Sequence, residues 1–270
     1  MSEAVLYDFW RSSASYRLRI ALNLAGIDTR SVPVDLPTKQ HKTEEHMARN
    51  PQGLVPVLEI DGARFTQSLA ILDYLDETRA LGLLPADPGE RAHVRALAHS
   101  VAVDVHPVCN VSVAAYAVEV SGREEVREMW MRRFIAPGLA AFEALLARWA
   151  QAPYCTGANV SLADICLMPQ LYNADRWGAD YSDCPRILAV KAANRADKLI
   201  AVVSQIDASV EDPNQDDLHE VGTVARIIKV LKMPDGSTTC IIQGKRTMRI
   251  DQITSYEPFL KASVTMLDEV

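Results

Sequence analysis

Cysteine is scarce in this sequence, and the few cysteines present are not spaced for cross-linking or metal binding. There are five, none in a Cys-x-x-Cys pair and all among apolar neighbours: Cys109, Cys155, Cys166, Cys184 and Cys240. An odd number of such thiols is typical of a reducing compartment, so we expect neither disulfides nor structural zinc. We also predict no other metal site, because the chain has no His-Glu-x-x-His motif and no helical ligand spacing among His93, His99 and His106.

Long hydrophobic runs and an excess of positive charge are missing too. No uncharged stretch approaches the roughly 18 residues of a membrane span, and the first residues lack the segments of a signal peptide. The formal net charge is -7, from 28 Lys and Arg against 35 Asp and Glu. This balance argues against a chain that coats nucleic acid or an anionic membrane, although it allows a local cationic pocket. We therefore expect a cytoplasmic protein with no nucleic-acid or membrane partner.

What the sequence does contain changes along its length. Its 270 residues, 49% of them hydrophobic, suffice for two packed units. The first 196 residues hold 31 alanines and all four tryptophans, whereas residues 197–270 hold 4 alanines and 22 Ile, Val or Thr. Alanine favours helices and β-branched residues favour strands, so we predict a mostly helical part followed by a strand-rich part.

Residue patterns predict an α+β chain in three parts. The order β-α-β-α-β-β-α over the first eighty residues is thioredoxin-like in outline, with strands at 5–9, 30–34, 57–60 and 64–66 and helices at 13–25, 42–49 and 68–78. A proline-rich linker follows, and helical periodicity then dominates from 90 to 198. Strands are expected at 199–205, 222–232, 238–243, 248–253 and 260–266, with a hairpin turn at 233–237 and an acidic, solvated loop at 207–220. The predicted domains are 1–84, all-α 85–190 and a partial β-rich 191–270.

Three local patterns in the first part suit ligand binding: two of them suit an anion, and the third, at Pro56, suits pairing of the main chain with an extended peptide. Ser12, Ser13 and Ser15 cluster where the first strand gives way to the first helix, and a helix N-terminus stabilises an anion such as a thiolate. The alternative is that Ser12 or Ser13 is only an N-cap. Pro56 immediately precedes the third strand, and the pair Gln67 and Ser68 opens another helix, where free amides could hold a carboxylate.

The order and spacing of these patterns resemble the zeta class of glutathione transferases, which contains the maleylacetoacetate isomerases, with the maleylpyruvate isomerases nearby. The resemblance covers about residues 3–190. It rests on residues 11–22 (RSSASYRLRIAL), 50–56 (NPQGLVP), 67–71 (QSLAI), 106–113 (HPVCNVSV) and 162–170 (LADICLMPQ). It implies a thioredoxin-like domain that holds glutathione, with Pro56 in the cis form, and a helical domain over a second substrate. It also implies a homodimer.

The resemblance assigns roles residue by residue. Ser12, with Ser13 beside it, would stabilise the glutathione thiolate, and Arg176 would anchor a substrate carboxylate with help from Arg11. Positions that match glutathione contacts are Ser12, Ser13, Ala14, Ser15, Tyr16, Arg17, His41, Val55, Gln67, Ser68, His106, Asn110, Val111 and Ser112. Alternatives stay open: Arg176 could form an interdomain salt bridge, and His41 and His106 could be core or helix-terminal histidines. Ala14 departs from the family, where many members carry cysteine.

The implied chemistry is cis-trans isomerisation of a maleyl-type diacid with glutathione as a cofactor that is not consumed. Reversible addition of a thiolate turns the double bond into a rotatable single bond. A free thiol ionises near pH 8.5, so hydrogen bonds and a helix N-terminus would be needed to increase the thiolate fraction. Alternative functions are conjugation or dehalogenation of small electrophiles, and a binding protein without catalysis.

From about residue 191 the chain instead resembles the N-terminal substrate-recognition domain of Lon proteases. The match rests on residues 197–205 (DKLIAVVSQ), 220–228 (EVGTVARII) and 243–246 (QGKR), while the opening strands of that domain are missing. No Gly-x-x-x-x-Gly-Lys-Ser/Thr motif occurs, so ATP-driven proteolysis is excluded. We expect a fusion, natural or artificial, with its seam in a helix at 187–198. The resemblance implies weak binding of unfolded polypeptide, and a partial sheet leaves strand edges open to pairing.

Overall fold

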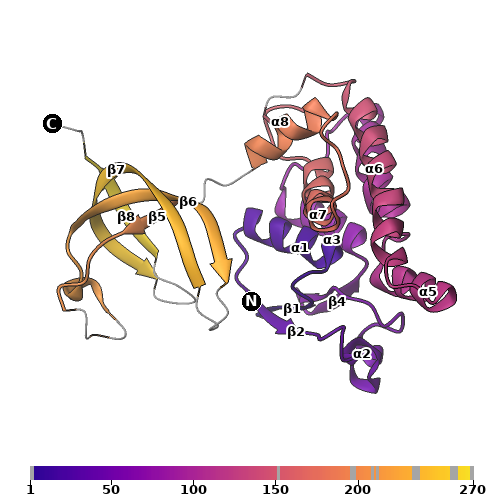
Figure 1. Ribbon diagram of the computed structural model, residues 1–270, viewed down its shortest axis with the longest axis horizontal. Helices are drawn as coiled ribbons and strands as arrows, with labels where there is room; N and C mark the ends of the chain where they lie inside the picture. The colour runs from indigo at the N-terminus through magenta and orange to yellow at the C-terminus, as the bar shows by residue number, and fades with distance from the viewer. Residues whose placement is uncertain are drawn as a thin grey trace. The chain divides into compact units, whose positions relative to one another are not determined.

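The computed structural model describes residues 3–150, 153–194, 199–207, 210, 213–232, 238–255 and 261–267 (Figure 1). The chain divides into two compact units, residues 1–194 and 195–270. The finer division at 84 and 190 stays a prediction. In the described part of the chain, no helix is long and apolar enough to cross a membrane.

A four-stranded sheet begins the first unit, and its element order is the predicted β-α-β-α-β-β-α. Strand β1 pairs parallel with β2 and antiparallel with β3, and the spatial order is β2-β1-β3-β4. The Val55-Pro56 peptide is cis, as expected. The elements are β1 (Ala4–Asp8), α1 (Ser13–Leu24), β2 (Thr29–Pro33), α2 (Glu44–Arg49), β3 (Val57–Ile60), β4 (Ala63–Thr66) and α3 (Ser68–Arg79).

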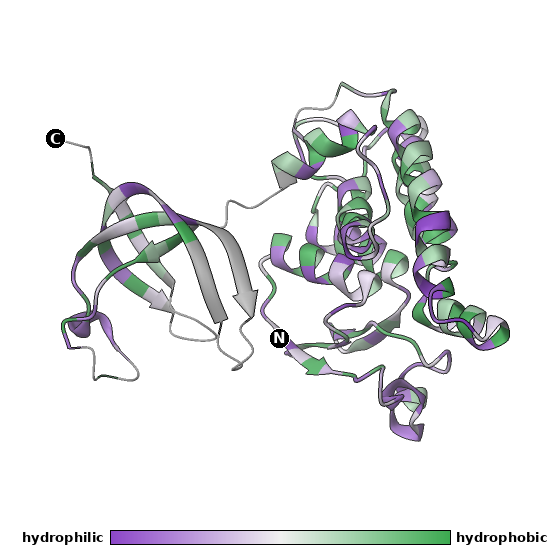
Figure 2. Cartoon of the chain, viewed as in Figure 1, coloured by the Kyte–Doolittle hydropathy of each residue, from purple (hydrophilic) through white to green (hydrophobic). Residues whose placement is uncertain are grey.

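The predicted helix at 42–49 is wrong at its start. A short 3-10 helix, Gln40–Lys42, comes first, and α2 begins only at Glu44. The reason is Thr43, which is the N-cap of α2. Its backbone is extended, and its hydroxyl oxygen accepts a hydrogen bond from the amide of His46 at 3.4 Å. Figure 2 shows that α2 is mostly hydrophilic, and His46 is its only buried residue among those described.

Helices make up the rest of the first unit, as predicted. They are α4 (Pro88–His99), a π-helix (Ser100–Val105), α5 (Val111–Ser121), α6 (Val126–Leu146), α7 (Leu162–Trp177) and α8 (Pro185–Asn194). Helix α7 packs against α1, α4 and α6. One continuous cluster of buried apolar side chains runs from Ala4 on β1 to Val190 on α8, so the sheet and the helices share a core.

Two carboxylates fix helix starts in this unit. Asp164 accepts hydrogen bonds from the amide and hydroxyl of Ser161, at 2.9 and 2.7 Å, in a capping box that begins α7. Glu143 on α6 accepts from the amides of Arg186 and Ile187 at 3.1 and 2.9 Å, at the start of α8. Amides at the starts of α7 and α8 are thereby satisfied, which fixes where these two helices begin.

The second unit is an antiparallel sheet with strand order β5-β6-β7-β8. Its strands are β5 (Leu199–Val202), β6 (Val221–Lys232), β7 (Thr238–Ser255) and β8 (Lys261–Met266). Its buried apolar cluster contains five of the described residues: Leu218, Val224, Met248, Ile250 and Ile253.

Two predictions for the second unit are corrected. The expected strands at 238–243 and 248–253 are one strand, β7, because Gly244 lies at a register shift opposite Ala225 and not in a turn. The expected loop at 207–220 contains a 3-10 helix, Gln215–Asp217, begun by a capping box of Asn214 and Asp217. The hairpin turn at 233–237 lies outside the described residues, as does part of the expected seam helix, residues 195–198.

Candidate functional site

Ser12 caps helix α1, as one of the two sequence interpretations proposed. Its backbone is extended, and its hydroxyl oxygen accepts a hydrogen bond from the amide of Ser15 at 3.2 Å. This bond uses a lone pair of the oxygen and leaves the hydroxyl proton available to a further acceptor. The cap is therefore compatible with the other interpretation, in which the same hydroxyl donates to an anion.

Ser13, the first residue of α1, connects this helix to α7. Its side chain is buried, and its hydroxyl accepts a hydrogen bond from the Asn173 side-chain amide at 3.0 Å. Ala14 follows with no group that could react. The hydroxyl of Ser15 is fully buried and has no partner in the described part of the chain.

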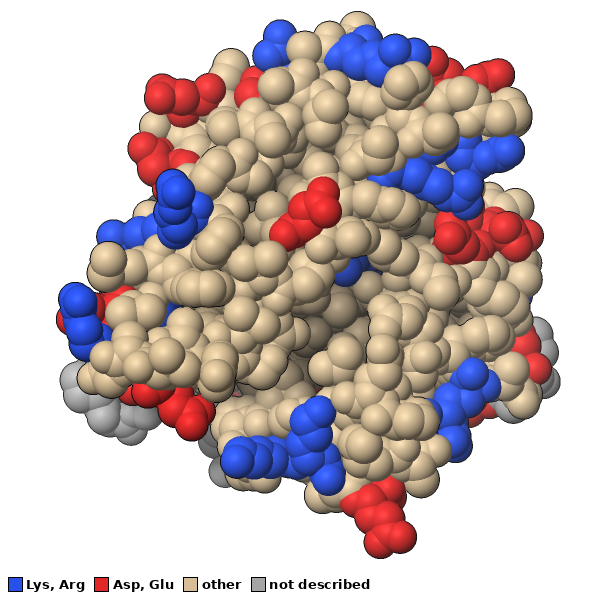
Figure 3. All heavy atoms as spheres, turned by 90° about the vertical axis from the view of Figure 1, so that its right-hand side faces the viewer, with Lys and Arg blue, Asp and Glu red and all other residues tan. Residues whose placement is uncertain are grey.

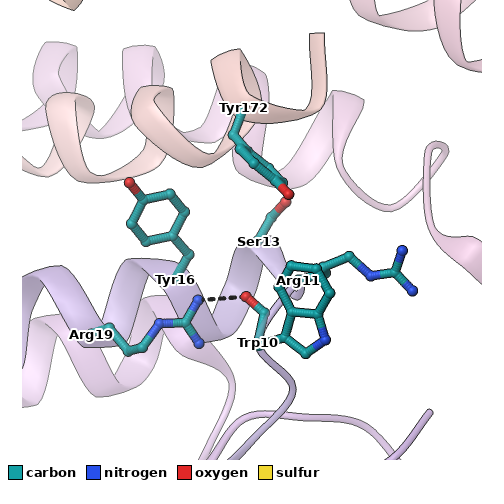
Figure 4. A pocket seen from close by; sticks show the side chains of 6 residues that line it. All are labelled: Trp10, Arg11, Ser13, Tyr16, Arg19 and Tyr172. Carbon is teal, nitrogen blue, oxygen red and sulfur yellow. Dashed lines mark hydrogen bonds between the residues drawn. The ribbon is translucent and has the colours of Figure 1, made fainter. Parts of the chain in front are cut away.

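A pocket of about 260 Å³ opens beside Ser13 (Figure 4). Its lining residues are Trp10, Arg11, Ser13, Tyr16, Arg19 and Tyr172. In Figure 4 the ring of Tyr172 descends from α7 with its hydroxyl toward Ser13, and the Arg19 guanidinium donates to the Trp10 carbonyl at 2.8 Å. Sequence reasoning had missed Tyr172 and Asn173; the only available signal was their place in the helical turn before Arg176.

Arg11 adds positive charge in the lining of this pocket, and Arg176 adds it nearby, within electrostatic range of Arg11 and Tyr172. The Arg176 guanidinium stacks over Trp177 at 4.6 Å, and that of Arg11 over Trp10 at 4.9 Å. Burial lowers the pKa of Arg176, and the charge of Arg11 lowers it further, so the two cations lie within range of each other. Neither is paired with a carboxylate among the described residues, which leaves the expected interdomain salt bridge of Arg176 without support there.

The start of α3 forms a second polar region. Gln67 adopts φ 69° and ψ 106°, a backbone conformation that costs a residue with a side chain about 1–3 kcal/mol. Its side-chain Nε2 donates a hydrogen bond to Gln52 Oε1 at 2.7 Å. Ser68 is buried, and its hydroxyl accepts from Arg17 Nη1 at 3.1 Å. This bond places Gln67 and Ser68 next to the inner side of α1.

Val55 and His41 lie in the segments that approach α3. In the described part of the chain, neither the main-chain amide nor the carbonyl of Val55 makes a hydrogen bond, so both are open to an extended ligand. The Nδ1 atom of His41 is buried and has no partner within the described ranges. Burial, and then the charges of Lys42, His46 and Lys39, lower the pKa of the His41 ring, which favours its neutral form.

His106 and the start of α5 complete the set predicted from the sequence. His106 is half-buried directly after the π-helix; burial, and then the charge of Arg17, lower the pKa of its ring to about 3. Asn110 Oδ1 accepts from the amide and hydroxyl of Ser112, at 3.1 and 3.0 Å, and thereby caps α5, while Val111 is exposed. The described hydrogen bonds therefore join Arg17 on α1 to Ser68 on α3 and Ser13 on α1 to Asn173 on α7, but do not link Asn110 or Ser112 to α1.

The surface around these elements carries mixed charge. Figure 3 shows acidic and basic side chains interspersed on one face, which is hollowed near its centre, with a basic side chain in the hollow. A thioredoxin-like sheet, a capped α1 next to a covering α7, and unpaired arginines above them define the architecture of a glutathione transferase.

Comparisons with known proteins agree with that class. Residues 2–77 match the family model of the glutathione S-transferase N-terminal domain, and residues 180–269 match that of the substrate-binding domain of ATP-dependent protease La (Lon). Maleylacetoacetate isomerase from Rhizobium meliloti is 58% identical over 191 residues, 70% of this chain and 90% of that protein. The Mus musculus protein of the same name is 44% identical, over 68% of this chain and 83% of its own length.

Solved structures give the same result. A bacterial maleylpyruvate isomerase described as a zeta-class glutathione S-transferase has a TM-score of 0.68 and 41% identity, over 70% of this chain and 91% of its own. Maleylacetoacetate isomerase from Methylobacterium extorquens, solved with malonate and GSH, has a TM-score of 0.66 and 39% identity, over 70% and 90%. The chain belongs to the maleylacetoacetate isomerase family of zeta-class glutathione transferases and continues into a Lon-type substrate-binding region.

Proposed function

We propose that the protein is a glutathione-dependent cis-trans isomerase of maleylacetoacetate or maleylpyruvate. The observation that carries this proposal is the pairing of a capped α1, whose Ser12 proton is free to donate, with two arginines that have no carboxylate partner among the described residues. The first suits a thiolate and the second suits a substrate with carboxylates. Structures of relatives hold malonate with GSH, and dicarboxyethyl glutathione with citrate.

In the proposed reaction each residue handles negative charge. Ser12 and the amides of α1 hold the glutathione sulfur as thiolate. The sulfur adds to one carbon of the cis double bond, and the electron pair moves onto the conjugated carbonyl as an enolate. Rotation about the new single bond follows, the enolate reforms the double bond, and the carbon-sulfur bond breaks to release the same thiolate. Arg176, assisted by Arg11, anchors a carboxylate and stabilises the enolate.

The remaining family positions would hold the tripeptide. The open main chain of Val55 is suited to pair with its extended backbone, and Gln67 and Ser68 with a carboxylate. Ala14 rules out covalent capture through a cysteine at that position, whereas the proposed addition and release need only the sulfur of glutathione. The half-buried His106, the His41 ring and the Asn110 to Ser112 turn stay proposed contacts.

The loss of maleylacetoacetate absorbance on addition of glutathione tests the proposal. Ser12→Ala should lower kcat about 100-fold, because a donor to the sulfur is lost. Arg176→Ala should mainly raise KM for the diacid. Matched controls are Ser182→Ala and Arg95→Ala, which change an exposed and a half-buried residue outside the site and should retain activity. Full turnover in both Ser12→Ala and Arg176→Ala would overturn the site assignment.

The match of residues 180–269 to a substrate-binding domain favours a second candidate function, binding of unfolded polypeptide by the second unit. Capture of denatured casein by the full chain, competed by excess casein but not by glutathione, would support it. No capture at micromolar concentrations would contradict it.

A homodimer is proposed as well, and light scattering at the mass of two chains would support it.

A further inference from the structure

Arg17 is a buried cation with little to neutralise it. It lies in the second turn of α1 with only 3% of its surface exposed, and its Nη1 donates to the Ser68 hydroxyl at 3.1 Å. Its Nε is buried without a partner, and no carboxylate among the described residues pairs with it. A buried charge without a counter-charge is strongly unfavourable, so its presence requires an explanation beyond packing.

The neighbours of Arg17 are polar but carry no negative charge. Burial raises the pKa of the Cys166 thiol to about 11, and burial with the charge of Arg17 lowers that of His106 to about 3, so both are neutral at pH 7. Gln170 lies one turn beyond Cys166 on α7, almost fully buried, and neither of its side-chain amide atoms has a partner among the residues that the structure describes. The folded chain thus places a positive charge among neutral groups.

Ser68 connects Arg17 to the N-terminus of α3 through its hydroxyl group. Because its hydroxyl oxygen accepts from Arg17, its own proton is left to donate elsewhere. Ser68 is the first residue of α3, where main-chain amides also face outward, and the strained Gln67 precedes it. Arg17, Ser68 and the helix amides therefore all favour a negative group at the same place.

We propose that Arg17 is a positioning residue which orients the Ser68 hydroxyl, and adds a fixed positive charge behind it, for a carboxylate of glutathione bound at Gln67 and Ser68. This inference rests on the proposed function. The counter-charge of Arg17 is then the ligand, which arrives only on binding. A residue retained for packing alone would instead contribute to the stability of the ligand-free protein.

In the full chain, Arg17→Met should weaken the binding of glutathione without lowering the thermal stability of the ligand-free protein. Calorimetry should show a Kd for glutathione raised about 10- to 100-fold, because a hydrogen bond that serves a charged group is lost. The Tm without glutathione should stay the same or rise, because a buried unpaired charge is removed. Arg17→Lys keeps the charge and should lose less affinity, while Arg95→Met, at a half-buried ion pair with Asp73, controls for the substitution.

A double-mutant cycle with Ser68→Ala separates the outcomes. Arg17→Met should weaken glutathione binding much less in the Ser68→Ala background than in the unmodified protein. It should barely change the Kd of glutathione diethyl ester, whose two carboxyl groups are uncharged esters. An equal loss in both backgrounds, or for both ligands, would overturn the role of Arg17, as would a lower Tm with unchanged Kd. If the unmodified protein binds no glutathione, the proposed function fails first.

Discussion

The two units of this chain differ in how each is held together. In the first, one cluster of buried side chains extends from β1 to α8 and includes Phe142, Leu18 and Leu58, all fully buried. In the second, the described cluster has five members around Met248, and long strand pairings join β6 to β7. A sheet with a small core depends more on its ladder of hydrogen bonds, so the two units should differ in stability and in response to mutation.

The largest expected effect comes from Phe142→Ala. Removing this fully buried ring should destabilise the first unit by about 3–5 kcal/mol. Chemical denaturation followed by tryptophan fluorescence measures it selectively, because all four tryptophans lie before residue 195. Met248→Ala, the control in the second unit, should leave that transition in place; a shift of similar size would show that the two units unfold together.

A smaller effect should appear on acidification, through His106. Its folded pKa of about 3 lies below the unfolded value near 6.5, so between these pH values the unfolded chain binds more protons. The stability that neutral His106 supplies is therefore complete above pH 6.5 and decreases by up to about 1.4 kcal/mol per unit as pH falls. His106→Gln should flatten this dependence in the tryptophan transition between pH 7 and 5. An unchanged slope would contradict it.

The smallest effect is expected from removing the second unit. A chain that ends at Asn194 retains every residue of the first core cluster and the proposed site, so its kcat/KM for maleylacetoacetate should stay within about twofold. The full chain, assayed at the same concentration, is the control. A loss of tenfold or more would mean that the second unit supports the site.

The sequence predicted the first unit well where signals are local. Ser12 caps α1, as one sequence interpretation proposed, and β4 follows closely after β3, as expected, because caps and tight turns depend on a few adjacent residues. The π-helix before His106 had no such signal. Tyr172 and Asn173 were missed because their roles arise from contact between α7 and α1, and Asn173 lies 160 residues from Ser13.

In the second unit, the sequence predicted two strands, 238–243 and 248–253, where the structure has one. Strand β7 continues through Gly244 with a shift in register. A glycine in a strand can mark a turn or a bulge, and only the partner strand decides which. The site residues, in turn, came mainly from the family resemblance, since no local rule tells that Arg17 is buried or that Arg176 lies near Arg11.

A core common to sheet and helices has a mechanical consequence. Because a close-packed interior deforms little, β1, α1 and α7 act as one stiff frame, fastened further by the bond from Asn173 to Ser13. The pocket beside α1 then cannot widen by a hinge between layers. Its opening must adjust through the side chains that line it, and Trp10, 66% exposed, is the most exposed of those labelled in Figure 4.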